Sequence, residues 1–157
     1  MILWEAWDEE RNCGPDRETE EELLQIILGI MKPYNMHHVP SEEMPELDVK
    51  NFYLCQIGEE YVGAAGYKMQ DATTGKTTLL AVLPEFAGQG IGLKLQQLRV
   101  HKMKELGAKE IITNSDRPKT IAWYKKQGYE EVGKFKKLHS FGSDEVDHWT
   151  TLRLKVN

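Results

Sequence analysis

Short runs of apolar residues, separated by segments rich in Gly, Pro, Asp and Glu, predict a sheet along much of the chain. In the clearest run, residues 79–83 are all apolar, and Pro84 ends the run because proline has no N–H for the next ladder hydrogen bond. Three successive runs are joined only by short turns, one of them the turn-rich segment 71–76, which predicts an antiparallel meander. The expected strands are residues 2–6, 51–57, 61–69, 77–83, 110–113, 129–139 and 148–156.

Other segments have the period of an amphipathic helix. Thr19 and Glu22 form a capping box directly before an apolar run that Pro33 ends, which predicts a buried helix. A short second helix is expected within residues 41–48. The longest helix is expected after a glycine-rich loop, with apolar residues at spacings of four and three and Gly107 as its C-terminal cap.

The last helix is expected to begin at Ser115 or Asp116 as its N-cap, with Pro118 in its first turn, and to end at Gly128. The element order is then β-α-α-β-β-β-α-β-α-β-β. The strand–helix–strand unit in the middle is expected to be a parallel crossover. These elements predict an α+β, three-layer fold: one domain over residues 1–157 with a mixed central sheet of about six to seven strands flanked by helices.

Composition excludes several classes of protein. Hydrophobic residues make up 40% and charged residues 29% of the 157, and no apolar run approaches the roughly 20 residues of a membrane helix. The formal net charge of −5 argues against a nucleic-acid partner. The acidic N-terminus does not resemble a signal peptide, and Cys13 and Cys55 offer no disulfide framework. We expect a cytoplasmic protein with no membrane partner and with Cys55 as a core thiol.

The glycine-rich loop is the clearest candidate for a binding site. Gly88, Gly90 and Gly92 leave backbone N–H groups uncovered where a helix begins, and such a terminus attracts phosphate groups. The even spacing of the glycines does not fit the dinucleotide fingerprint G-x-G-x-x-G. The segment 75–77 ends like a phosphate loop, but Gln70 stands where the first glycine of that motif is required.

A third pattern does fit. The segment VLPEFAGQGIG (82–92) resembles the acetyl-coenzyme A loop of the GNAT superfamily of N-acetyltransferases, V-x-P followed by [RQ]-x-x-G-x-[GA], with Ala87 at the position of Arg or Gln. The segment DRPKTIAWYKKQGYEEVG (116–133) is similar to the family's N-x-x-A-x-x-x-Y-x-K-x-G-F segment: Tyr124 and Gly128 match, whereas Arg117 replaces the Asn. The expected element order is also that of the family, so the resemblance covers nearly the whole chain.

The resemblance implies roles for particular residues. The strand before the loop would pair with the pantetheine arm of acetyl-CoA, the loop amides would hold the pyrophosphate, and Tyr124 would protonate or stabilise the departing thiolate. The implied cofactor-binding residues are Leu80, Ala81, Val82, Gly88, Gln89, Gly90, Ile91, Gly92, Leu93 and Asn114. Four lysines are candidates to line the phosphates: Lys94, Lys119, Lys125 and Lys126. No metal site is expected.

The implied activity is direct transfer of an acetyl group from acetyl-CoA to a primary amine of a small molecule or peptide. The general base stays open: candidates are His139, Asp147, His148 and Glu130, or a water molecule. Lys76 falls near the place where some relatives have a glutamate base, which keeps a non-catalytic coenzyme A-binding or sensing domain as the alternative. An acidic interaction module is a third possibility, and a homodimer through the edges of the sheet is possible.

The first half of the chain is strongly acidic between residues 16 and 48. Two interpretations are open. The carboxylates either form a solvated helix face, in which those of the first turn complement the helix dipole, or form a wall that attracts a cationic amine.

Overall fold

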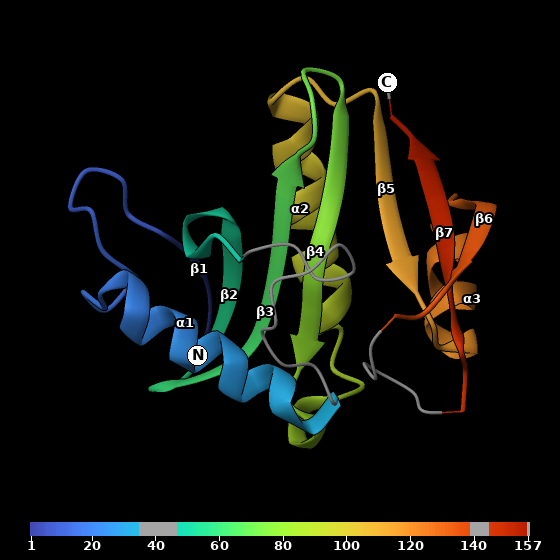
Figure 1. Cartoon of the computed structure of the whole chain (residues 1–157). Helices are drawn as coiled ribbons and strands as arrows, with labels where there is room; N and C mark the ends of the chain where they lie inside the picture. Colours follow the sequence, from blue (N-terminus) through green and yellow to red (C-terminus); the bar gives the residue numbers. More distant parts are fainter. Residues whose placement is uncertain (35–46, 139–144, 157) are drawn as a thin grey trace.

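The computed structural model describes residues 1–34, 47–138 and 145–156, which form one seven-stranded sheet with three α-helices (Figure 1). The strands are β1 (Ile2–Ala6), β2 (Phe52–Ile57), β3 (Glu60–Met69), β4 (Thr74–Val82), β5 (Glu110–Ser115), β6 (Glu130–Lys136) and β7 (His148–Lys155). The α-helices are α1 (Glu20–Met31), α2 (Ile91–Glu105) and α3 (Pro118–Lys126), and the short 3₁₀ turns are η1 (Lys32–Tyr34), η2 (Val49–Asn51) and η3 (Pro84–Phe86).

The strand order in space is β1-β2-β3-β4-β5-β7-β6. Strands β1 to β4 form the antiparallel meander predicted from their short connections. β4 and β5 are parallel, as expected for the crossover through α2, and β7 lies between β5 and the edge strand β6. The prediction of a mixed sheet of six to seven strands is therefore confirmed.

The two faces of the sheet carry separate clusters of core residues. Leu54 and Ala64 pack with α1, whereas their neighbours Cys55 and Ala65 pack with α2, as the alternation of side chains along a strand requires. Figure 1 shows α1 in front of the sheet and α2 behind it. The result is the three-layer arrangement. Cys55 is fully buried, and burial raises the pKa of its thiol, which agrees with a core role.

β4 begins earlier than the turn-like composition of residues 71–76 predicted, since residues 74–76 belong to the strand and make all of its pairs with β5. The reason is packing. A Cβ on Gly75 would lie 2.6 Å from the sulfur of Met103 in α2, so this glycine allows the helix to approach the strand and does not mark a turn.

The helix ends follow backbone chemistry. The Thr19 side chain accepts a hydrogen bond from the Glu22 N–H at 3.1 Å, which confirms the predicted cap of α1. Gly107 and Gly128 lie just beyond α2 and α3 with φ of +105° and +100°, a conformation that glycine adopts readily.

The predicted N-cap of α3 is wrong. Ser115 is still paired within β5, and Arg117 occupies the cap position with no side-chain hydrogen bond. Pro118 lies in the first turn, as predicted. The second helix expected within residues 41–48 lies, except for its last two residues, outside the described part of the chain, and those two residues are not helical.

Candidate active site

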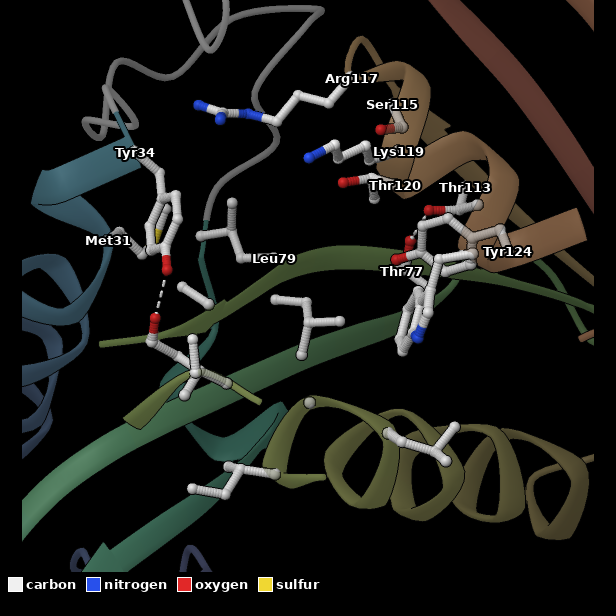
Figure 2. A pocket seen from close by; sticks show the side chains of 18 of the residues that line it. Met31, Tyr34, Thr77, Leu79, Thr113, Ser115, Arg117, Lys119, Thr120 and Tyr124 are labelled. Carbon is white, nitrogen blue, oxygen red and sulfur yellow. Dashed lines mark hydrogen bonds between the residues drawn. The ribbon is translucent and has the colours of Figure 1, made fainter. Parts of the chain in front are cut away.

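A cavity of about 720 Å³ lies between the diverging ends of β4 and β5. η1, the loop before α2 and the start of α3 complete its walls (Figure 2). The strands pair only between residues 74–76 and 110–112, and the hydroxyls of Thr77 and Thr113 form a buried hydrogen bond directly after this pairing ends. Beyond that bond β4 and β5 no longer pair with each other, so backbone groups on their facing edges are available to a ligand. We call this gap between the two strands the notch.

The loop at one end of the cavity is shaped by two glycines in the left-handed conformation. Gly88 and Gly90 both have φ of +80°, and a Cβ at either position would meet no atom within 4 Å. Gly90 is the N-cap of α2 and has no side chain to accept from the first turn. The first amides of a helix have no partner inside the helix, so this end of the cavity offers several N–H donors and a favourable dipole to an anion.

Tyr124 lies at the opposite end of the notch, on α3, and is 4% exposed. Figure 2 shows its ring beside Thr77 and Thr113, which also line the cavity. Its hydroxyl oxygen accepts a hydrogen bond of 2.8 Å from Nη2 of Arg99 in α2.

Arg99 is fully buried and lines the cavity. Its Nη1 donates at 3.1 Å to the carbonyls of Gly66 in β3 and Leu79 in β4, at a shift in the register of the two strands. Its Nε donates to Gln96 at 2.6 Å, and Gln96 donates in turn to the Tyr129 hydroxyl at 2.8 Å. Among the described residues, no carboxylate pairs with this guanidinium group.

The side of the cavity formed by η1, α3 and β7 is aromatic and charged. The Tyr34 hydroxyl donates to the Val82 carbonyl at 2.5 Å, and the Arg117 guanidinium lies 5.7 Å from the centre of the Tyr34 ring. Figure 2 shows Arg117 reaching from α3 towards Tyr34 above the cavity. Asp116 forms a buried ion pair of 2.8 Å with Lys137, whose Nζ lies 4.9 Å from the centre of the Trp149 ring.

The structure brings together most of the predicted cofactor-binding residues and Tyr124, but not most of the other candidates. Of the predicted cofactor-binding residues, all but Gln89 line the cavity, as does Tyr124. Of the four candidate lysines, Lys119 lines it and the other three do not. Lys76 does not line it either, and burial together with the neighbouring Lys68 lowers the pKa of its ammonium group.

The three candidate bases that the structure describes, Glu130, Asp147 and His148, do not line the cavity. Asp147 and His148 lie 3.2 Å apart in an exposed pair, and Glu130 is bound to Arg153 at 2.6 Å. His139 lies outside the described residues. Among the described lining residues the one carboxylate belongs to Asp116.

The acidic residues of α1 lie in its first turn, about 14–17 Å of helix away from the cavity end at Met31. Their position favours the interpretation that they complement the helix dipole.

Sequence reasoning missed Arg99, Gln96, Thr77 and Thr113. A signal for Arg99 exists: Ile91, Leu95, Arg99 and Met103 recur every four residues, so the arginine falls on the buried stripe of α2. A charged residue on such a stripe requires buried partners.

Within the described residues, no group of three or more His, Cys, Asp or Glu side chains is placed to hold a metal ion. No described helix has both the length and the apolar character needed to cross a membrane.

Comparisons with known proteins agree with this geometry. N-alpha-acetyltransferase 30 of Schizosaccharomyces pombe is 29% identical over 134 residues, which are 79% of this chain and 86% of that protein. The ribosomal-protein-S18-alanine N-acetyltransferase of Escherichia coli has a similar structure, with a TM-score of 0.71 at 14% identity over 100% of this chain and 95% of the other. A GNAT family acetyltransferase of Elizabethkingia anophelis, solved with acetyl-CoA bound, has a TM-score of 0.61 at 19% identity over 67% of this chain and 75% of the other.

The sequence model of the acetyltransferase (GNAT) family matches residues 3–129. That match runs from β1 to the end of α3 and includes the notch, the glycine loop and Tyr124. By this match the chain belongs to the acetyltransferase (GNAT) family.

Proposed function

We propose that this acetyl-CoA-dependent N-acetyltransferase acts on the α-amine of a polypeptide. The observation that carries the proposal is the similarity to N-alpha-acetyltransferase 30, which extends over 86% of that protein. The cavity is consistent with it, because Tyr34 and Trp149 are among its lining residues, and aromatic side chains suit the side chain of a leading residue.

We assign the cofactor to the notch. The main chain of residues 80–82 pairs with the pantetheine arm as an additional strand would, and the amides of residues 88–93 hold the pyrophosphate. Three features support this assignment: the end of β4–β5 pairing, the open space above Gly88 and Gly90, and the N-terminus of α2 directed at the cavity. Asn114 lies on the opposite strand, where its side-chain oxygen accepts from the Thr151 hydroxyl at 2.8 Å.

In the proposed reaction the amine nitrogen attacks the thioester carbonyl carbon and forms the C–N bond. The C–S bond breaks with its electron pair on sulfur, and the Tyr124 hydroxyl gives its proton to that sulfur. The proton lost by nitrogen passes to water, and Tyr124 is reprotonated from solvent. A water molecule fits the role of base, since the lining carboxylate of Asp116 is held by Lys137.

The first test is thermal unfolding with and without acetyl-CoA. A cofactor at 100 times its Kd stabilises a protein by about 2.7 kcal/mol, which raises its Tm clearly. The absence of a shift at millimolar acetyl-CoA would contradict the assignment of the notch.

The second test uses peptides that differ in their first residue, each paired with the same peptide carrying a blocked α-amine. Acetylation of the free peptides alone supports the proposal. Modification of lysine side chains or free polyamines alone would refute action on an α-amine, although the protein would still be an N-acetyltransferase. Cofactor binding without transfer to any amine would favour the sensing alternative.

Two further expectations remain proposals. Both cysteines are free thiols, which is consistent with action in the reducing cytoplasm. A homodimer stays a prediction that the edge strands β1 and β6 make reasonable.

A further inference from the structure

Arg99 is an unusual residue to find in a core. Its side chain is 0% exposed, and in the part of the chain that the structure describes its partners are two carbonyls, an amide and a phenol, all uncharged. A buried charge without a counter-ion is costly, and an apolar residue of similar volume would avoid that cost. The guanidinium group is thus a positive charge held next to Tyr124 with no anion to neutralise it.

The hydrogen bonds also fix the direction of the Tyr124 hydroxyl. Arginine can only donate, so the Nη2 contact occupies a lone pair of the phenol oxygen. No described residue accepts the phenol's own hydrogen. Because Tyr124 lines the cavity, that hydrogen is left to point into the space between β4 and β5.

We propose that Arg99 is the positioning residue that turns the Tyr124 hydroxyl towards the leaving sulfur and supplies the counter-charge for the anion formed there. The inference rests on the proposed function, because that anion is the thiolate released when the C–S bond breaks. Within the described part of the resting protein the charge has no anionic partner, and during transfer it gains one. An interaction that becomes stronger as the reaction proceeds lowers the barrier and does not merely tighten binding.

Substitution of Gln96 offers a way to neutralise the charge of Arg99 without removing the hydrogen bonds of Arg99. The oxygen of Gln96 must face Arg99, since Nε–H is a donor, and its amide nitrogen faces the Tyr129 hydroxyl. In Gln96→Glu both contacts can persist, because the Tyr129 hydroxyl can reverse and donate to the carboxylate. The new carboxylate, 1% exposed like the amide it replaces, gives Arg99 a permanent counter-ion.

The main experiment compares Gln96→Glu with Gln97→Glu, the same substitution on the exposed neighbour in α2. We expect Gln96→Glu to unfold at the same or a higher temperature and to bind acetyl-CoA normally, but to lower kcat by about tenfold or more, which is within the contribution of a positioned proton donor. Gln97→Glu should match the wild type. Equal kcat values in Gln96→Glu and wild type would overturn the proposal.

A double-mutant cycle tests whether Arg99 acts through Tyr124. Arg99→Met and Tyr124→Phe should each lower kcat with little change in the KM for acetyl-CoA, and the double variant should be close to the worse single variant. Losses that multiply would mean that Arg99 supports the fold in general, and would contradict the proposal. Arg99→Lys, which keeps the charge, should recover part of the lost rate.

A measurement without any acceptor separates this inference from the proposed function. From about pH 7 to about pH 9, where thiols ionise, the wild type should bind CoA progressively more tightly than desulfo-CoA. In Gln96→Glu the ratio of the two affinities should be nearly constant with pH. A wild type that binds neither compound refutes the proposed function, whereas equal pH dependence in both proteins refutes only the role of Arg99.

Discussion

At the scale of single residues, Gly90 has the backbone conformation and the open space that the proposed anion site requires. Its φ of +80° is strained for any residue with a Cβ, typically by about 1–2 kcal/mol, and the space above it is empty of protein atoms. A connecting turn can also contain such a glycine, as Gly58 does between β2 and β3, so the conformation alone does not identify a ligand site. Gly90 differs from Gly58 in its place: it is the N-cap of α2 and lines the cavity.

We predict that Gly90→Asp abolishes binding of acetyl-CoA, because a carboxylate would face the pyrophosphate at the start of α2. The matched control is Gly58→Asp in the β2–β3 turn, where φ is +62° and a Cβ also meets no atom within 4 Å. Both variants carry similar backbone strain, so a similar loss of Tm is expected. Isothermal titration should show binding in the control alone. Retained affinity in Gly90→Asp would refute the loop assignment.

At the scale of elements, the important feature is where β4 and β5 part. The hydrogen bond between Thr77 and Thr113 lies directly beyond the last paired residues and fixes the inner end of the notch. Both side chains are buried, so either hydroxyl would be left without a partner if the other were removed. An orphaned buried hydroxyl costs more than the hydrogen bond itself contributes.

We predict that Thr113→Val lowers the free energy of unfolding by roughly 1–3 kcal/mol, and that the double variant Thr77→Val/Thr113→Val recovers much of this loss. Thr78→Val is the control, since the Thr78 hydroxyl is buried with no partner among the described residues and its removal should cost nothing. Urea denaturation without cofactor measures all three. A double variant less stable than Thr113→Val would contradict the explanation.

Elements were predictable where one local pattern decides them. Such local patterns are the capping box of Thr19, the periodic stripe of α2 and the glycines after the helices. Each depends only on neighbouring residues, so patterns of this kind predicted most of the helices and strands. The start of β4 was missed because Gly75 looks like a turn residue until Met103 is packed against it. Arg99 was missed for a related reason: its partners Gly66 and Leu79 lie on β3 and β4, far from it in the sequence.

At the scale of the whole molecule, the negative net charge of the protein must be reconciled with the binding of a negatively charged cofactor. The chain has a formal net charge of −5, and acetyl-CoA carries several phosphate charges, so attraction depends on where the positive side chains lie. Around the described cavity the lining residues include Arg99, Arg117 and Lys119 but only one carboxylate, which is paired with a lysine. The cavity is therefore basic within an acidic protein.

Lys119 and Lys125 provide a matched pair for testing this distribution, because both lie on α3. Lys119 points into the cavity in Figure 2, whereas Lys125 contacts Glu131 at 3.3 Å on the outside. We predict that Lys119→Gln raises the Kd for acetyl-CoA by a factor of about 1.4 to 5 at low salt, since an exposed charge pair contributes about 0.2–1 kcal/mol. Lys125→Gln should leave the Kd unchanged, although it removes the same charge from the same helix.

The salt dependence of the two variants distinguishes a local contact from a general field. Added salt screens exposed charges, so the wild-type Kd should rise with ionic strength and the difference between wild type and Lys119→Gln should shrink. If both lysine variants weaken binding equally, the cofactor responds to the total charge of the protein, and Lys119 has no special position. If only Lys119→Gln weakens binding and its effect fades with salt, the cofactor phosphates lie within reach of the Lys119 side chain at the start of α3.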